Sequence, residues 1–305
     1  MFTTSSAEFL AVCATLQPLP NPCAIARAAF LVAPATANFA AESARDNRYM
    51  QIDDTFDVQR TREQHAALAQ ALRADVPVVT FPGDPEAPDG MFPNNVFATA
   101  PGKLVIGSMH HGVRRREAQR EDIRGFFRDL LGCAEIDLSR SADCTAELTG
   151  SLVIDHARGI GFCGLSDRCD MAGARAMHEA FGLALTFCFE LAAGEYHTNV
   201  VMASLAGRAV ILAPDGFRDP AVPRAIAQAF GDRALWLSNE QKRDYAGNAI
   251  TLSNSRVWMS ARAAACLTNA QRESLASWGF RIGTVELSEI EKAGGSLRCC
   301  VAEIF

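Results

Sequence analysis

The sequence lacks the features that mark nucleic-acid binding, membrane insertion or secretion. Its 305 residues carry 29 Lys and Arg against 35 Asp and Glu, a net charge of -6, so no large basic surface is expected for a nucleic acid. No apolar run approaches the roughly 20 residues of a membrane-spanning helix. The first residues also lack the positively charged start of a signal peptide. We therefore expect a cytoplasmic protein with no nucleic-acid or membrane partner.

The ten cysteines lack the paired spacing of a disulfide framework or a zinc site. Neither Cys163 with Cys169 nor Cys299 with Cys300 forms a C-x-x-C pair, so no metal is expected, and no other cofactor is implied. Free thiols in a reducing compartment fit this pattern better. A composition of 49% hydrophobic and 21% charged residues is that of a globular protein, long enough for one large domain or two ordinary ones.

What the sequence does contain is a unit of about 50 residues that recurs along the chain. In each unit a small or polar step precedes a short apolar run with strand propensity. The steps fall at Asn95, Ser151, Asn199, Asn248 and Arg298, spaced by 56, 48, 49 and 50 residues. This periodicity predicts an array of similar supersecondary units, each with the order strand, strand, helix, strand. Such an array can close into a ring. An ordinary doubly wound sheet is the alternative, although its repeats are usually shorter.

The pattern also predicts where the elements lie. Strands are expected at 96–98, 152–154, 200–203, 249–252 and 299–302, and amphipathic helices at 61–72, 116–131, 172–181 and 223–230. The segment 159–164 matches G-x-G-x-x-G, but residues 155–159 read as a hairpin turn that places the glycines in the return strand. A dinucleotide site is therefore not expected.

Residues suited to covalent chemistry stand at the steps. If the strands converge, so do Asp89, Asn95, Glu147, His197, Asn248 and Cys299. Singly, each has a common structural explanation, such as a turn residue, a surface carboxylate or a buried histidine. Together they suit a planar cation: a thiolate attacks its carbon, carboxylates hold it, and a histidine moves protons. We expect Arg298 to lower the pKa of the Cys299 thiol, which opens the last apolar run.

Several segments resemble one known superfamily. Asp89–Asn95, Glu147–Ser151, Tyr196–Val200 and Gly294–Cys299 are similar to the guanidine-modifying enzymes, the arginine deiminase and amidinotransferase superfamily. Residues 114–117, 165–168, 246–248 and 259–262 resemble its citrulline-hydrolase and dihydrolase branch. The resemblance implies an α/β pentein fold, a five-fold pseudosymmetric α/β propeller with the active site in its central channel. It covers a single catalytic domain at 28–305, after an N-terminal extension at 1–27.

The resemblance also implies residue roles. Cys299 would be the nucleophile, since the family's thiol directly follows the Gly-Gly-x-x-Arg step, and Cys300 a bystander. His197 would be the general acid and base, and Glu147 the carboxylate that binds the guanidinium. The residues expected to bind substrate are Asp89, Asn94, Asn95, Arg114 and Arg168, with the two arginines gripping the amino-acid carboxylate.

Asn95 departs from the deiminases and dimethylarginine hydrolases, which carry Asp there, and resembles the Phe-Pro-Asn-Asn of the dihydrolases. An amide both donates and accepts, so it can bind the ureido oxygen of citrulline. We therefore predict that a small guanidino or ureido amino acid, arginine or citrulline, is hydrolysed to ornithine, ammonia and carbon dioxide through a thiouronium-type intermediate. The alternatives are a deiminase or dimethylarginine hydrolase that stops at citrulline, an amidinotransferase, and a pentein used only for binding. Loops 45–51 and 215–223 are expected to set specificity, and the sequence leaves a homodimer open.

Overall fold

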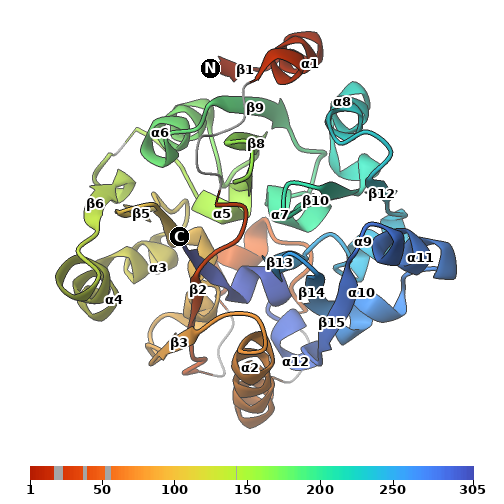
Figure 1. Cartoon of the computed structure of the whole chain (residues 1–305). Helices are drawn as coiled ribbons and strands as arrows, with labels where there is room; N and C mark the ends of the chain where they lie inside the picture. The colour runs from red at the N-terminus through yellow and green to blue at the C-terminus, as the bar shows by residue number, and fades with distance from the viewer. Residues whose placement is uncertain (17–22, 37–39, 52–55, 142) are drawn as a thin grey trace.

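Five small sheets surround a common centre, with the longer helices on the outside (Figure 1). The computed structural model describes residues 1–16, 23–36, 40–51, 56–141 and 143–305. Within these described ranges, four of the sheets have three strands and one has four. Within the described residues, no helix combines the length and the apolar character needed to cross a membrane.

Each sheet combines an antiparallel hairpin with a third strand that runs parallel to the second. In the first complete unit, β4 (Phe97–Ala100) and β5 (Lys103–Ile106) form the hairpin, and β6 (Ala134–Asp137) pairs with β5. Three further sheets repeat this order with β7 (Leu152–Asp155), β8 (Ile160–Leu165) and β9 (Leu185–Glu190); β10 (Met202–Leu205), β11 (Ala209–Leu212) and β12 (Ala234–Trp236); and β13 (Ile250–Ser253), β14 (Arg256–Ser260) and β15 (Arg281–Val285). The predicted order of strand, strand, helix, strand is confirmed.

The two ends of the chain build the fifth sheet together. β16 (Ala302–Ile304) pairs antiparallel with β2 (Ala28–Val32), and β3 (Val78–Phe81) pairs parallel with β2. In Figure 1 the blue C-terminal strand meets the red β2 at this sheet. A doubly wound sheet would have placed these strands in one continuous layer. The closed ring of separate sheets confirms the predicted pentein architecture.

Most helices connect the second and third strands of a unit. The longer ones are α2 (Val58–Leu72), α6 (Met171–Phe181), α8 (Ala221–Ala229) and α11 (Asn269–Ser277). The shorter ones are α3 (Gly112–Arg115), α4 (Glu121–Gly125), α9 (Asn239–Arg243), α10 (Ala261–Ala265) and α12 (Ser288–Glu291). Of these, α9 and α12 lie between the third strand of one unit and the first strand of the next. The single helix expected at 116–131 is wrong: extended backbone at Arg120 separates a turn at Glu117–Gln119 from α4, which continues as a π-helix over Phe126–Leu130.

The first residues add a fourth strand to one sheet. β1 (Phe2–Thr3) pairs parallel with β9, and α1 (Ser6–Thr15) follows it. Phe9 of α1 is fully buried and stacks on Phe187 at 4.5 Å between ring centroids. These residues pack on the ring, and the division at residue 27 stays a prediction.

Four of the five polar steps, all but the one at Asn248, are single helical turns that lead into the first strand of a unit. They are η3 (Pro93–Asn95), α5 (Leu148–Ser151), α7 (Thr198–Val201) and η8 (Leu297–Cys300). The strand predictions at 200–203 and 299–302 therefore began too early. The amides of Cys299 and Cys300 both donate to the Ser296 carbonyl, which closes a helical turn and delays the strand to Ala302. Cys300 thus lies in the same turn as Cys299 and not inside the strand.

A polar belt of equivalent hydrogen bonds joins successive steps around the ring. We use this name for Asn94, Thr149, Asn199, Asn248 and Arg298. Thr149 Oγ1 donates to the Asn94 carbonyl, Asn199 Nδ2 to the Thr149 carbonyl and Asn248 Nδ2 to the Asn199 carbonyl, each at 3.0 Å. The Arg298 amide donates to Asn248 Oδ1 at the same distance. Because buried amides and hydroxyls require partners, this belt fixes how neighbouring units meet.

Candidate active site

One pocket brings together most of the residues singled out in the sequence. Its empty volume, which includes space open to solvent, is about 280 Å³. Its lining includes six predicted site residues: Asp89, Asn95, Arg114, Arg168, His197 and Cys299. Glu147 is bonded to two of them, whereas Asn94 does not line the pocket. A larger cavity of about 510 Å³, lined by Thr149, Asn199 and Arg298 among others, contains none of the predicted catalytic residues.

His197 and Glu147 form a fully buried pair. His197 Nε2 lies 2.8 Å from Glu147 Oε2, and both side chains have no exposed surface. Burial alone would raise the pKa of Glu147, but the charge of Arg168 and the hydrogen bond with His197 outweigh it and hold that pKa well below its usual range. An ionised Glu147 accepts, so Nε2 must carry a proton and Nδ1 is left as the acceptor. Burial lowers the pKa of His197 against the pull of Glu147, which favours this neutral form.

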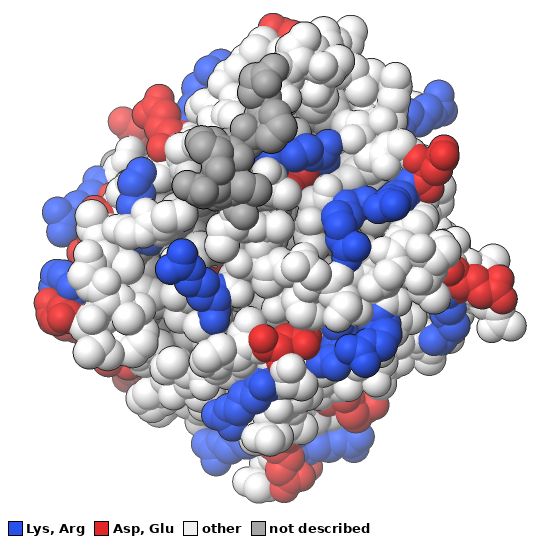
Figure 2. All heavy atoms as spheres, viewed as in Figure 1, with Lys and Arg blue, Asp and Glu red and all other residues white. Residues whose placement is uncertain are grey.

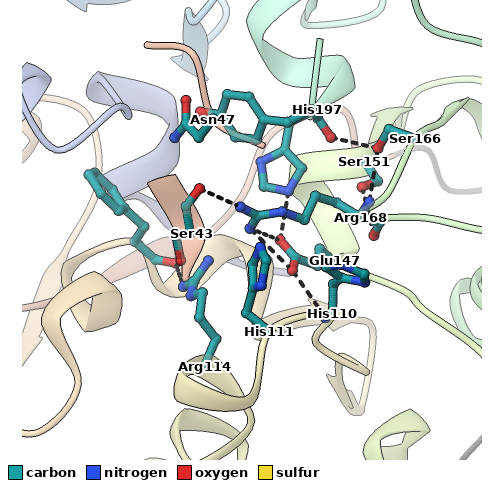
Figure 3. A network of polar contacts seen from close by, with 12 residues as sticks. Ser43, Asn47, His110, His111, Arg114, Glu147, Ser151, Ser166, Arg168 and His197 are labelled. Carbon is teal, nitrogen blue, oxygen red and sulfur yellow. Dashed lines mark hydrogen bonds and ion pairs between the residues drawn. The ribbon is translucent and has the colours of Figure 1, made fainter. Parts of the chain in front are cut away.

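Arg168 links Glu147 to a segment on the other side of the pocket (Figure 3). Its Nη1 donates to Glu147 Oε2 at 3.2 Å, and its Nε and Nη2 each donate to one oxygen of Asp46 at 2.6 Å. Nη2 also donates to the Ser43 carbonyl at 3.2 Å. The guanidinium is therefore occupied on every side by this chain's own oxygens. Its expected grip on a substrate carboxylate stays a prediction.

Cys299 is buried in the pocket wall, 2% exposed. Asn248 Nδ2 donates to its Sγ at 3.3 Å. Burial raises the pKa of Cys299 above its usual value, and it outweighs the hydrogen bonds of Ser296 and Asn248 and the charges of Arg298 and Arg114, which all act to lower that pKa. Arg298 therefore acts in the expected direction, but the expected net lowering of the thiol pKa is wrong. The side chain of Arg298 is directed to the Val301 carbonyl at 2.7 Å and to Glu303 at 2.9 Å. The resting thiol is therefore protonated near neutral pH.

Arg114 and Asp89 form the opposite wall. Arg114 donates to Glu117 through Nε at 2.9 Å and Nη2 at 2.8 Å, and its Nε lies 3.9 Å from Asp89 Oδ2. The Ser43 hydroxyl donates to the same Asp89 oxygen. Four carboxylates, those of Asp46, Asp89, Glu117 and Glu147, thus face two guanidinium groups around the pocket. An excess of negative charge favours a cationic ligand.

Several buried polar atoms at the steps have no hydrogen-bond partner among the described residues. They are both side-chain ends of Asn94, Oδ1 of Asn95 and Nδ1 of His197. Two of them meet above Gly150: a Cβ there would lie 2.5 Å from Asn95 Oδ1 and 2.9 Å from His197 Nδ1. Unsatisfied buried acceptors are costly, so they mark places where a ligand or water belongs. The absence of a side chain at residue 150 keeps this corner open.

Sequence reasoning singled out only part of the segment that crosses the pocket and assigned no role to its individual residues. We call residues 40–51 the crossing segment; it includes the short η1 (Ser43–Arg45). Loop 45–51 was singled out for specificity, and Asn47 does line the pocket, whereas no residue of loop 215–223 does. No motif signals Ser43 or Asp46, since their roles come from contacts with residues distant in sequence.

One cluster could hold a metal ion. Asp46, His110 and His111 each place a ligand atom within 4.8 Å of the others. However, both oxygens of Asp46 are bonded to the Arg168 guanidinium, and Oδ1 is also 3.0 Å from His111 Nε2. A cation would therefore have to displace a guanidinium from Asp46. All ten cysteines are free.

The closed ring and the pocket it surrounds define the class of protein: a member of the pentein superfamily, in the branch that contains arginine dihydrolases and dimethylarginine dimethylaminohydrolases. Residues 33–305 match the family described as N,N dimethylarginine dimethylhydrolase, eukaryotic, and the chain belongs to that family.

Individual relatives are more distant. The uncharacterized protein YkgA of Bacillus subtilis (strain 168) is 24% identical over 254 residues, 83% of each chain. The N-terminal domain of ArgZ, an arginine dihydrolase from cyanobacteria, superimposes with a TM-score of 0.78 at 18% identity, over 91% of this chain and 97% of that domain. A dimethylarginine dimethylaminohydrolase solved as an adduct with 4-chloro-2-hydroxymethylpyridine superimposes with a TM-score of 0.70 at 23% identity, over 92% of this chain and 100% of that chain. These similarities agree with the fold described above.

Proposed function

We propose that this protein is a cysteine-dependent hydrolase of the C–N bonds of a guanidino or ureido amino acid, which converts arginine or citrulline to ornithine, ammonia and carbon dioxide. The observation that carries the proposal is the pairing of His197 with Glu147 in a pocket that Cys299 also lines. A thiol, a neutral histidine and an ionised carboxylate are the groups that substitution at a planar, cationic carbon requires.

The first half-reaction follows from the protonation states. A guanidinium bound among the carboxylates places a positive charge near the buried thiol and so lowers its pKa. The Cys299 proton passes to His197 Nδ1, the Sγ–C bond forms, and the C–N bond to the departing amine breaks as His197 returns the proton to it. Glu147 stabilises the histidine while it is positively charged. Ammonia leaves, and the substrate carbon stays attached to sulfur.

Water completes the reaction. His197 accepts a proton from water as its oxygen attacks the carbon, the Sγ–C bond breaks, and the thiol is restored. Arginine has then become citrulline. Repetition on the ureido carbon, with a second water, yields ornithine, a second ammonia and carbon dioxide.

Asn95 is the residue that supports the second round. Its Oδ1 lies beside His197 Nδ1 above Gly150, and its side chain lines the pocket. An amide can donate to the neutral ureido oxygen, whereas a carboxylate would repel it. The fold is shared with ArgZ, described as an arginine dihydrolase and solved with substrate bound to a cysteine-to-serine mutant.

A second candidate rests on the family match, which names dimethylarginine. A methylarginine hydrolase would use the same thiol and histidine, release methylamine or dimethylamine, and stop at citrulline. An amidinotransferase would instead pass the amidino group to an added amine, and a pentein used only for binding would show no turnover.

The test is a panel of arginine, citrulline, methylarginines, agmatine and succinylarginine, with the amine released per turnover counted and products identified. Citrulline should yield ornithine, and arginine should release two ammonia per molecule. Arginine turnover that stops cleanly at citrulline would refute the dihydrolase proposal. Cys299→Ser should abolish turnover while the protein stays folded, with Cys300→Ser as the matched control that retains activity.

A further inference from the structure

Among the residues that the structure describes, the pocket lining offers two permanent cations to a substrate carboxylate. Among its lining residues these are Arg114 and Arg168. Both are buried, and both already make paired hydrogen bonds to a carboxylate of this chain. An amino-acid substrate can therefore form a two-point contact with either arginine only by displacing one of these carboxylates.

Arg114 is the less available of the two. Its partner Glu117 lies three residues further along the chain and is 5% exposed. Arg114 Nη2 also donates to the carbonyls of Asp89 and Phe92. These contacts fix Arg114 within its own unit, and no separate segment could carry Glu117 away.

Arg168 is held differently. Asp46 lies on the crossing segment, 122 residues away in sequence, and its side chain is 14% exposed. Two parallel N–H···O bonds of 2.6 Å join it to Nε and Nη2, the arrangement with which a guanidinium binds any free carboxylate. Among the described residues, the carboxylate of Asp46 has one further side-chain partner besides Arg168, His111.

We propose that Asp46 is a specificity-determining residue that occupies, on Arg168, the place of a substrate's carboxylate. A substrate with a carboxylate must exchange with Asp46, whereas a guanidine without one leaves the pair intact. Asp46 therefore weakens binding of guanidino and ureido acids relative to the corresponding carboxylate-free amines. The inference rests on the proposed function, because it concerns the far end of the same substrate.

The crossing segment is held at points that would survive this exchange. Asn47 Nδ2 donates to the Gly294 carbonyl at 3.2 Å, Met50 bridges to Ala293, and the Tyr49 hydroxyl donates to Glu195 at 2.8 Å. Release of Asp46 from Arg168 therefore breaks one contact of the segment and leaves its other anchors in place. The exchange is therefore a rotation of the Asp46 side chain and not a displacement of the whole segment.

The experiment compares two ligands that differ only in the carboxylate. Arginine and agmatine are titrated calorimetrically into Cys299→Ser protein, with and without Asp46→Asn. The matched control is Asp167→Asn, which removes the same charge from the exposed neighbour of Arg168. In the Asp46→Asn protein, Kd for arginine should fall at least tenfold relative to that for agmatine, and Asp167→Asn should leave the ratio unchanged.

A binding ratio that stays constant, or moves toward agmatine, would overturn the inference and make Asp46 a structural support of Arg168. If Asp46→Asn fails to fold, Asp46→Glu provides the second variant, and its longer side chain should also shift the ratio toward arginine. If neither ligand bound any of these proteins, the proposed substrate class would fail and the role of Asp46 with it. That result differs from an unchanged ratio, so the two failures can be separated.

Discussion

Replacement of Glu147 by Gln separates the catalytic use of the buried carboxylate from its structural use. The change keeps the shape of the side chain and removes the charge that faces His197 at 2.8 Å and Arg168 at 3.2 Å. Without the carboxylate, His197 loses the partner that fixes its proton on Nε2 and stabilises its charged form. We expect turnover to fall on the order of a thousandfold, roughly 4 kcal/mol in activation free energy, because a mispositioned or wrong tautomer cannot serve as base.

The stability effect can be worked from the same contacts. Breaking a fully buried ion pair costs about 3–5 kcal/mol, and we take about 3 kcal/mol because Arg168 keeps Asp46 as a partner. With an unfolding entropy of about 2.1 cal/mol/K per residue, this lowers Tm by roughly 5 °C for a chain of this length. The pKa of Glu147 is lower in the folded than in the unfolded state, so its contribution is present above about pH 4.3 and is lost as the pH falls toward the folded value.

The assay pairs thermal unfolding at pH 7 and pH 3 with product formation from citrulline and arginine. Asp155→Asn is the matched control, since Asp155 is also fully buried and paired with an arginine, Arg158, but lies outside the pocket. It should lose stability and keep activity. The reasoning is refuted if Glu147→Gln retains activity within tenfold, or if its stability deficit is as large at pH 3 as at pH 7.

Three further predictions concern the thiol and its surroundings. Because burial raises the pKa of Cys299, inactivation by iodoacetamide should be slow at pH 7 and accelerate as the pH rises past 9, with peptide mapping to confirm the modified residue. Gly150→Ala should reduce turnover at least a hundredfold in initial-rate measurements, since its Cβ would meet His197 and Asn95. Gly90→Ala is the control: the nearest atom to its Cβ would be 3.5 Å away, so turnover should be nearly unchanged. Asn248→Ala removes the donor to the thiol and should lower kcat about tenfold with KM little changed. It also removes two hydrogen bonds of the polar belt, so Tm should fall as well, and the rates are compared at a temperature where unfolding curves show both proteins fully folded.

The architecture could be predicted from the sequence because the same pattern of residues recurs at a nearly constant spacing. Steps near 50 residues apart, each followed by an apolar run, indicated five similar units, and the sheets confirm them. The exact start of the strands could not be predicted at two steps. Val200 and Val201 have strong strand propensity but lie in α7, because the turn at Thr198–Val201 is set by contacts between units and overrides local preference.

The period alone predicted the candidate site where a residue belongs to a repeated step. Cys299, His197 and Glu147 occupy such steps and do converge. Arg114 and Arg168, which lie in connections and line the pocket, were predicted only through the family resemblance. The net shift of the thiol pKa was misjudged because the sequence does not show how deeply Cys299 is buried, and burial outweighs the lowering effect of the Arg298 charge. Asp46 reaches Arg168 across 122 residues, a contact that no local pattern encodes.

The polar belt explains why a thiol at the end of the chain can be part of this site at all. Asn199 donates to the carbonyl of residue 149, and Asn248 donates to that of residue 199, so each unit is fixed to the one before it by the same kind of bond. At the last step the same Asn248 amide also reaches Cys299 Sγ, and its oxygen accepts from the Arg298 amide. The hydrogen bonds that hold the ring together therefore also orient the nucleophile. A ring that closed with a different register would lose both, which ties the period seen in the sequence to the position of the reacting sulfur.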